Sequence, residues 1–213
     1  MNKPLYFLGI DNGGTLSKAA LFDADGVEVA SASRRIELIE AQPGWSERSA
    51  TAMWLDSAAA IREVVERSAI DPSEIAAIAC TGHGNGLYLV DGNGVPVRNA
   101  INSTDGRAAD IAARWQLDGT AAKALPLTAQ CVWPAQPNTL LAWLSEHEPE
   151  TIAHAAAVLF AKDFTRLQLT GEVWAELTDM SGSSLMNVVT GQYDDDVLAL
   201  FGIRECKRLL PPI

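Results

Sequence analysis

Three short apolar runs, separated by turns and followed by one long helical pattern, open the chain. The runs are Leu5–Asp11, Lys18–Asp23 and Val27–Arg35, and the turns between them are rich in glycine, asparagine and aspartate. Such runs and turns predict an antiparallel β-meander. This start constrains the fold strongly, because the common α/β sheets place a helix after every strand.

One helix and a further buried strand are predicted next. Trp54, Ala58, Ile61 and Val65 lie on one helical face, with charged residues around them. Ile75–Thr81 is a continuous apolar run, which favours a strand inside a sheet. Three strands, a helix and a strand, in this order, predict an α/β protein with the ribonuclease H-like (actin-like ATPase) fold. We expect a mixed sheet that begins with the β-meander and is flanked by helices.

The rest of the chain is mainly helical. Helices are expected at Thr104–Trp115, Ala135–Glu146 and Phe164–Thr170, and short strands at Leu87–Val90 and Ala157–Phe160. No tandem repeat or low-complexity segment is visible. A length of 213 residues permits one large domain or two small ones.

Composition narrows the function classes. Acidic residues number 27 against 16 basic ones, which gives a formal net charge of −11. A protein that binds nucleic-acid phosphates needs clustered lysine and arginine, so this class is disfavoured. An acidic chain can still bind a nucleotide, because backbone amides and one or two cations are sufficient.

Cysteine usage and hydropathy favour a reducing compartment. Cys80, Cys131 and Cys206 are widely spaced and form no CxxC pair, so neither a disulfide framework nor a zinc site is indicated. No signal-peptide pattern and no uncharged apolar stretch of about 18 residues is visible. We therefore expect a cytoplasmic protein with no membrane contact, and the sequence leaves open whether it is a monomer or a homodimer.

The turn between the first two runs is the first candidate site. Its two glycines leave backbone N–H groups free to approach an oxyanion, and hydroxyl groups and a lysine follow. Asp11, at the end of the first run, can hold Mg²⁺ through water. An ordinary hairpin turn is the alternative, since Asn-Gly is frequent in hairpins. The candidate phosphate-binding residues are Asp11, Gly13, Gly14, Thr15, Ser17 and Lys18, with Asp11 as the metal ligand.

Two polar segments suit the hydroxyl groups of a sugar. Gly82–Gly86 contains three glycines, which let a ligand approach the backbone, and His83 and Asn85 offer hydrogen bonds. Asp105 and Arg107 lie where a helix is predicted to begin, and they can bracket a polyol. The alternatives are an ordinary loop for the first segment and a helix cap for the second.

Asp179 is the candidate catalytic residue. It is the one acid in a segment of small polar residues, Thr178–Ser184, where a substrate hydroxyl can approach it. A positioned general base contributes about 10²–10⁴-fold to a rate. The alternative is a helix cap or an Asx turn, which aspartate favours. Trp45 or Trp133 would supply an apolar wall for the sugar.

Five segments resemble, in order and spacing, motifs of the FGGY family of carbohydrate kinases. They are Asp11–Lys18, Pro43–Glu47, Ile101–Arg107, Ala161–Gly171 and Glu176–Gly182. The resemblance extends over the whole chain. Within the family, the segments Gly82–Gly86, Ser103–Asp105 and Trp143–Pro149 are more similar to the L-xylulose/3-keto-L-gulonate kinases than to the D-xylulose kinases.

This resemblance implies a transferase that moves the γ-phosphoryl group of ATP, with Mg²⁺, to a hydroxyl of a ketose such as L-xylulose. It implies that Asp179 is the general base, that Asp11 is the Mg²⁺ partner, and that the residues after Asp11 contact phosphate. The residues that it assigns to orienting the sugar are His83, Asn85, Asp105 and Arg107.

FGGY kinases have two actin-like domains with the active site between them. The resemblance implies that residues 1–213 are the N-terminal, sugar-binding domain and that the C-terminal, ATP-binding domain is absent from this chain. We therefore expect the isolated chain to lack kinase turnover. The alternatives are a non-catalytic sugar-binding domain and another specificity of the family, such as xylulokinase or glycerol kinase. A nuclease with the ribonuclease H-like fold is disfavoured by the charge of −11.

Overall fold

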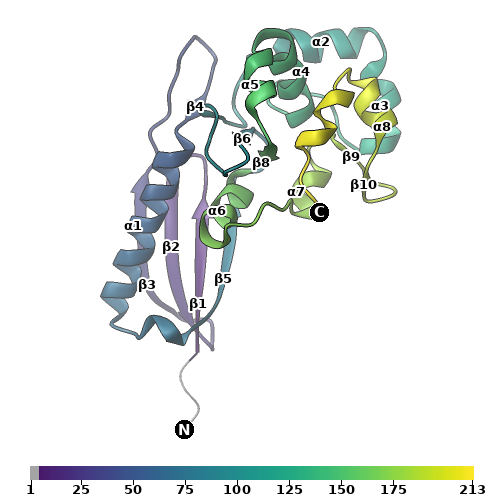
Figure 1. Ribbon diagram of the computed structural model, residues 1–213. Coiled ribbons are helices and arrows are strands. Elements are labelled where there is room, and N and C mark those ends of the chain that lie inside the picture. The colour runs from purple at the N-terminus through teal and green to yellow at the C-terminus, as the bar shows by residue number, and fades with distance from the viewer. Residues whose placement is uncertain (1–4) are drawn as a thin grey trace.

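The computed structural model describes residues 5–213 and contains a four-stranded sheet beside a mainly helical region (Figure 1). The strands are β1 (Tyr6–Asn12), β2 (Leu16–Asp23), β3 (Glu28–Arg35), β4 (Glu47–Arg48), β5 (Ile75–Gly82), β6 (Tyr88–Val90), β7 (Ala100–Ile101), β8 (Ala157–Leu159), β9 (Met186–Asn187) and β10 (Gln192–Tyr193). The α-helices are α1 (Ala50–Ser68), α2 (Ala109–Leu117), α3 (Thr120–Thr128), α4 (Pro137–His147), α5 (Pro149–His154), α6 (Ala161–Thr170), α7 (Leu177–Ser181) and α8 (Asp195–Leu200). Short 3₁₀ helices lie at Pro72–Glu74 and Arg204–Leu209.

The main sheet is mixed and has the strand order β3-β2-β1-β5. β1 pairs antiparallel with β2, β2 pairs antiparallel with β3, and β1 pairs parallel with β5. The predicted β-meander and the predicted strand after the first helix are therefore confirmed. The register places Asp11 opposite Lys18 and Asn12 opposite Ser17, so the two residues of each pair share one face of the sheet.

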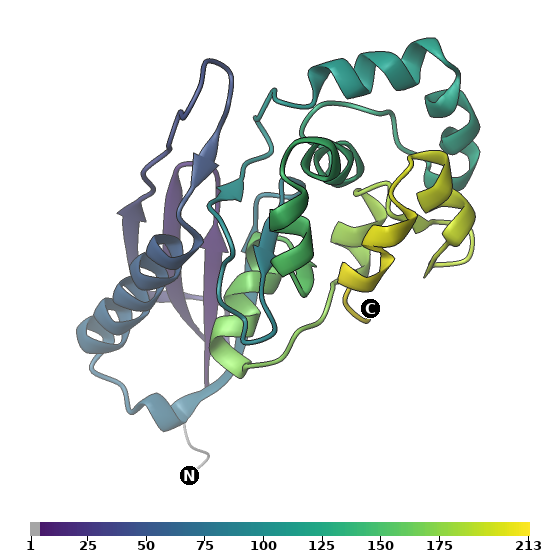
Figure 2. The ribbon, with the colours of Figure 1, turned by 45° about the horizontal axis from the view of Figure 1, so that its top comes forward.

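The two faces of this sheet differ in what covers them. α1 packs across one face (Figure 2), and Leu8, Ile10 and Leu21 are almost fully buried beneath it. On the opposite face, Phe7 and Ile78 are 43% and 48% exposed. Neighbouring side chains of a strand point to opposite faces. Asp11 and Lys18 therefore lie on the open face.

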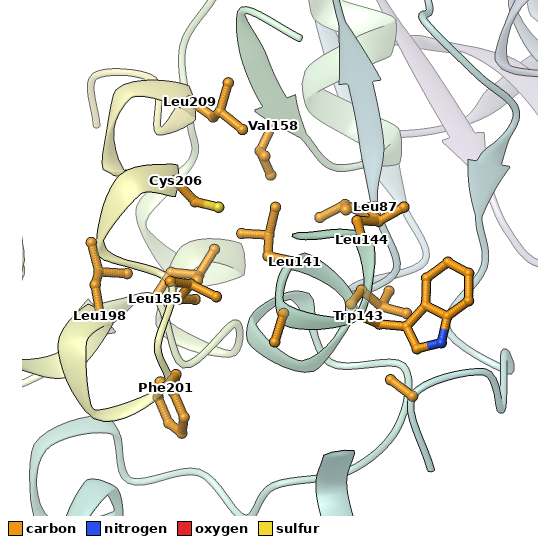
Figure 3. Close-up of a cluster of buried hydrophobic side chains, with 14 of the residues drawn as sticks. Leu87, Leu141, Trp143, Leu144, Val158, Leu185, Leu198, Phe201, Cys206 and Leu209 are labelled. Atoms are coloured by element: carbon orange, nitrogen blue, oxygen red, sulfur yellow. The ribbon is translucent and has the colours of Figure 1, made fainter. Parts of the chain in front are cut away.

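A second core fills the helical region. Leu140, Leu141 and Leu144 of α4 have no exposed surface. Figure 3 shows Leu141 between two groups of side chains, with Leu185 and Cys206 from the C-terminal segment on one side and Leu87 and Leu144 on the other. α6 follows β8 closely and packs against β5, so it joins this helical region to the sheet.

Some element boundaries differ from the sequence prediction. α2 begins at Ala109 rather than at Thr104, because the preceding residues form a turn that buried ion pairs hold. α6 begins at Ala161 rather than at Phe164. α3 was not predicted, and Pro126 inside it explains why, since proline normally ends a helical pattern. None of the helices within residues 5–213 has the length and apolarity that a membrane span requires.

Candidate functional site

The candidate site forms where β1 and β5, two neighbouring parallel strands, end at the same edge of the sheet. Beyond β5 the chain passes between β1 and the first turn of α6. A side-chain carbon at Gly82 would lie 2.9 Å from the Asn12 carbonyl oxygen and 3.1 Å from Cβ of Ala161. These distances leave no room for a side chain. Glycine at this position therefore allows the strand ends and α6 to meet.

Asn12 anchors this edge from the covered face. Its side chain is fully buried, with Nδ2 donating to Oγ1 of Thr165 at 2.7 Å and Oδ1 accepting from Oγ of Ser57 at 2.9 Å. These bonds tie the end of β1 to α6 and to α1, so Asn12 positions the turn and does not face a ligand. Sequence reasoning did not single it out, because its two partners lie far away along the chain.

The glycine turn presents most of its candidate residues to solvent. Gly14, Thr15 and Lys18 are exposed, whereas the N–H of Gly13 donates to the Leu16 carbonyl oxygen at 3.1 Å and closes the turn. Ser17 faces the opposite way. Its hydroxyl is buried beneath the turn and has no hydrogen-bond partner within residues 5–213.

Asp11 completes the accessible side of this turn. It lies opposite Lys18 in the strand pair and beside Thr81 of β5. Within the described part of the chain, no hydrogen bond or ion pair engages its carboxylate. A carboxylate that is free of protein partners and stands next to exposed backbone is suited to a hydrated divalent cation.

A buried arginine connects this turn to the loop after β5. Arg48, in β4, has no exposed surface. Its Nη2 donates to the Gly13 carbonyl oxygen at 3.0 Å and lies 2.8 Å from Nδ1 of His83, and its Nε donates to Oδ1 of Asn102 at 2.8 Å. Sequence analysis missed Arg48, because no motif marks a residue whose partners lie in three separate turns. We call Arg48, Gly13, His83 and Asn102 the turn-linking cluster.

His83 is held at the strand end by both its backbone and its ring. Its backbone N–H donates to the Asn12 carbonyl oxygen at 3.0 Å. Burial, followed by the positive charge of Arg48, lowers the pKa of His83 to about 4, although a hydrogen bond with the Asn12 backbone opposes this shift. The imidazole is therefore neutral at pH 7 and offers hydrogen bonds without charge.

Asn85 lies two residues further along the same loop in a left-handed conformation, with φ of 59°. Asparagine tolerates this conformation better than most residues do. Its Oδ1 is buried and has no hydrogen-bond partner in residues 5–213. A buried oxygen without a partner is costly, so this atom is a candidate for contact with a ligand or a water molecule.

Asp179 is brought to the same loop from α7. A side-chain carbon on Gly84 would lie 3.2 Å from Oδ1 of Asp179, so the bare glycine keeps this carboxylate close to the loop. The other oxygen, Oδ2, lies 3.3 Å from Nζ of Lys162, which also pairs with Glu176 at 2.6 Å. Glu176 is the N-cap of α7, so Asp179 does not cap this helix.

The two carboxylates at Lys162 differ in acidity. Burial raises the pKa of Asp179, and the charge of Lys162 only partly opposes this. Burial also acts to raise the pKa of Glu176, but hydrogen bonds from Lys162 and Thr178 outweigh it and lower the pKa to about 2. Asp179 is therefore the better proton acceptor of the pair.

Asp105 and Arg107 lie in a separate buried cluster. Oδ1 of Asp105 accepts from Nε of Arg107 at 2.9 Å, and Nη2 of Arg107 donates to Oε1 of Glu47 at 2.7 Å. Arg98 pairs with the same Glu47 carboxylate. The Arg107 guanidinium lies 4.1 Å from the centre of the Trp45 ring, so Trp45 packs on this cluster. Arg98 also pairs with Glu148, and we call Glu47, Arg98, Asp105, Arg107 and Glu148 the ion-pair cluster.

The structure thus joins some of the predicted site residues and separates others. The Asp11 turn, His83 and Asp179 meet at one edge of the sheet. Asp105 and Arg107 bind mainly to each other, and Nη1 of Arg107 is the buried nitrogen that they leave unpaired within residues 5–213. Asp105 also does not cap α2, whose N-cap is Ala108.

Comparison with known proteins identifies the family. The sequence pattern of the N-terminal domain of the FGGY family of carbohydrate kinases matches residues 6–213. The chain belongs to the FGGY family of carbohydrate kinases. The resemblance drawn from the five sequence segments is therefore confirmed.

Relatives of this FGGY chain include kinases of L-xylulose. An L-xylulose/3-keto-L-gulonate kinase of Escherichia coli K12 is 39% identical over 208 residues, which cover 98% of this chain and 42% of that protein. A probable L-xylulose kinase of Pasteurella multocida is 38% identical, with 98% of this chain and 43% of that protein covered. This FGGY chain thus spans less than half the length of these relatives.

Solved structures of the family share the fold. A gluconate kinase from Lactobacillus acidophilus matches with a TM-score of 0.90 and 26% identity, covering 99% of this chain and 42% of that one. A ligand-bound xylulose kinase from the same species matches with a TM-score of 0.89 and 26% identity, covering 98% of this chain and 41% of that one. The predicted actin-like ATPase fold is confirmed.

Proposed function

We propose that this FGGY chain is the N-terminal, sugar-binding half of an ATP-dependent kinase that phosphorylates a hydroxyl of a ketose such as L-xylulose. The observation that carries the proposal is the meeting of three polar elements at one sheet edge: the accessible turn at Asp11, the loop at His83 and the carboxylate of Asp179. The relatives named L-xylulose kinases support a ketose as the substrate class. We place the ATP-binding domain in a part of the enzyme outside this chain.

The turn at Asp11 fits a phosphate group that carries a metal ion. Within residues 5–213 no side chain pairs with the Asp11 carboxylate, and Gly14, Thr15 and Lys18 are exposed beside it. Residues 5–213 hold no group of three or more potential metal-binding side chains, and Mg²⁺ needs none, because it usually takes one or two carboxylates and keeps several waters. When bound, Mg²⁺ neutralises the phosphate charge during transfer. Asp11 would hold it, and the exposed turn residues would contact phosphate oxygens.

The loop after β5 would orient the sugar. His83 offers a neutral ring, and Asn85 offers an oxygen that lacks a partner within residues 5–213. Asp105 and Arg107 would contribute through Nη1 of Arg107, because the other polar atoms of this pair are engaged. Gly13 would hold the phosphate turn closed through its backbone hydrogen bond, and Ser17 would support the turn from the covered face of the sheet.

Asp179 would accept the proton of the reacting hydroxyl. Its carboxylate lies beside the glycine loop, Lys162 restrains it, and burial raises its pKa. A general base in such a position is worth about 10²–10⁴-fold in rate. The protein's own contribution to phosphoryl transfer is otherwise mainly positioning and charge neutralisation.

An ATP-coupled assay on the complete kinase, run with a panel of ketoses, tests this proposal. We expect turnover of L-xylulose and a loss of at least 100-fold in kcat for Asp179→Asn, on the scale of general-base catalysis. Asp195→Asn, in a half-exposed ion pair with Lys207, is the matched control and should retain activity. A loss below tenfold in Asp179→Asn would show that Asp179 is not the general base.

Measurements on the 213-residue chain by itself test whether it is one half of a kinase or a complete enzyme. It should bind L-xylulose, seen as a higher melting temperature, because a ligand that binds only the folded state stabilises it by mass action. It should not turn over ATP. Turnover by this chain alone would refute the division into halves, and a complete protein that binds ketoses without phosphorylating them would be a sugar-binding module.

A further inference from the structure

Arg48 is a fully buried cation whose hydrogen-bond partners in the described part of the chain carry no negative charge. Its donors reach the Gly13 carbonyl oxygen, Oδ1 of Asn102 and the His83 ring. No carboxylate within residues 5–213 forms an ion pair with it. Proteins rarely bury an unpaired charge, because its lost hydration is not repaid by a counter-ion. A function that needs this guanidinium would explain why it is kept.

The partners of Arg48 belong to three segments of the proposed site. Gly13 lies in the phosphate turn, His83 lies in the sugar loop, and Asn102 precedes the turn that contains Asp105 and Arg107. Arg48 itself is adjacent to Ser49, the N-cap of α1, whose hydroxyl accepts from the backbone N–H of Ala52 at 3.1 Å. The backbone of Arg48 is therefore fixed by a helix start while its side chain reaches three loops.

We propose that Arg48 is a positioning residue, whose guanidinium sets the His83 ring and the Gly13 turn in one fixed arrangement so that sugar and phosphate are brought into line. This proposal rests on the proposed function, which assigns His83 to the sugar and the turn to phosphate. Arginine suits the task because its planar group presents several donors in a rigid fork. Lysine carries the same charge but cannot reproduce this geometry.

The arrangement predicts that the two ligands help each other to bind. A sugar that orders His83 also orders Arg48, and Arg48 in turn restrains the carbonyl of Gly13. The gain in affinity must be the same in both directions, as thermodynamic linkage requires. A merely structural arginine would lower stability on removal without changing either binding site.

The test uses the 213-residue chain and three variants: Arg48→Met, Arg48→Lys and the control Arg208→Met. Arg208 also donates to backbone carbonyl oxygens, those of Ala155 and Ile152, but it lies outside both the turn-linking cluster and the ion-pair cluster. One readout is the affinity for L-xylulose by calorimetry. The other is the titration of the His83 ring by NMR, with the resonance assigned by loss in His83→Asn.

We expect Arg48→Met and Arg48→Lys to bind L-xylulose at least tenfold more weakly, while Arg208→Met binds normally. The protonation midpoint of His83 should rise in Arg48→Met and stay low in Arg48→Lys. Besides Arg48, the titratable group packed near this ring is Tyr88, at 6.0 Å between ring centres, and Asp179 lies beyond Gly84. Both are unchanged in all variants.

Wild-type affinity in Arg48→Lys, or unchanged affinity and an unchanged His83 midpoint in Arg48→Met, would overturn the proposal. If Arg48→Met does not fold, the affinity of Arg48→Lys for L-xylulose tests the proposal, because this variant retains the buried charge and changes only its geometry. If the wild-type chain itself does not bind L-xylulose, the proposed function has failed. In that case the protonation midpoint of His83 in Arg48→Met still shows whether Arg48 sets the environment of the His83 imidazole.

Discussion

The two neighbouring residues of β4, Glu47 and Arg48, belong to two different polar clusters. Glu47 enters the ion-pair cluster, where it binds Arg107 and Arg98, whereas Arg48 enters the turn-linking cluster, where its partners are a carbonyl, an amide and an imidazole. Arg48 and Arg107 are both buried. They differ in whether a carboxylate neutralises them.

This difference sets the two pKa values in opposite directions. Burial lowers the pKa of Arg48, and a weaker interaction with Tyr88 opposes it. Burial also acts to lower the pKa of Arg107, but its bonds with Asp105 and Glu47 outweigh this and raise the pKa. The ion-pair cluster thus joins three chain segments through charges that neutralise one another. The turn-linking cluster keeps an unneutralised charge next to the candidate site.

The largest effect is expected from breaking the ion-pair cluster. Arg107→Met leaves the carboxylates of Asp105 and Glu47 buried, and removal of one partner from a buried pair costs about 3–5 kcal/mol. Arg48→Met leaves only uncharged acceptors without a partner, which costs about 1–3 kcal/mol. Urea unfolding of both variants at pH 7 measures these losses. An Arg48→Met variant less stable than Arg107→Met would contradict the comparison.

A smaller, pH-dependent effect should come from His83. The unfolded chain protonates this imidazole near pH 6.5, but the folded chain does so only near its lowered pKa of about 4. The unfolded state therefore binds more protons between these values, so stability is complete above pH 6.5 and is lost as the pH falls toward 4. At about 1.4 kcal/mol per pH unit, the loss reaches roughly 3 kcal/mol at most.

His83→Asn tests this pH dependence. The difference in unfolding free energy between the wild type and the variant should shrink as the pH falls from 7 to 4. Chemical denaturation across that range measures it. A constant difference at every pH would show that His83 is not buried beside a positive charge.

The smallest effect should come from a surface ion pair, which sets the baseline. Arg114 binds Glu146 at 2.6 Å, but both side chains are about half exposed, at 52% and 46%. Exposed pairs contribute about 0–1 kcal/mol, because water and salt screen them. Arg114→Ala should therefore shift the unfolding midpoint little. A large shift would show that burial does not explain the larger losses of stability expected for the two buried clusters.

Much of the sheet could be predicted from local patterns. The runs around Leu8 and Leu21 alternate with turns, and the helix at Ala50–Ser68 has a clear apolar face, so their order alone indicated the fold. The helical region was predicted less well. The helical pattern of α3 is interrupted by Pro126, so this helix was not predicted. The start of α2 was predicted too early, because Arg107 pairs with Glu47 and belongs to a turn before the helix.

The candidate site shows the same division. Asp11, His83 and Asp179 belong to recognisable turns or motifs, and each was named from the sequence. Arg48 and Asn12 were not, because their importance depends on partners in distant segments. Asp105 and Arg107 were predicted to face a sugar, and the structure shows that they bind mainly to each other.

The sequence by itself determined the meander, the glycine turns and the family, because strand periodicity, turn chemistry and motif order are local properties. Only the tertiary structure decided which polar side chains are free and which are engaged. Asp11 and Ser17 lie at the ends of β1 and β2, on either side of one turn. The register nevertheless places Asp11 on the open face of the sheet and Ser17 on the covered face. Whether a charge is neutralised depends on which segments meet around it, and that is decided by packing.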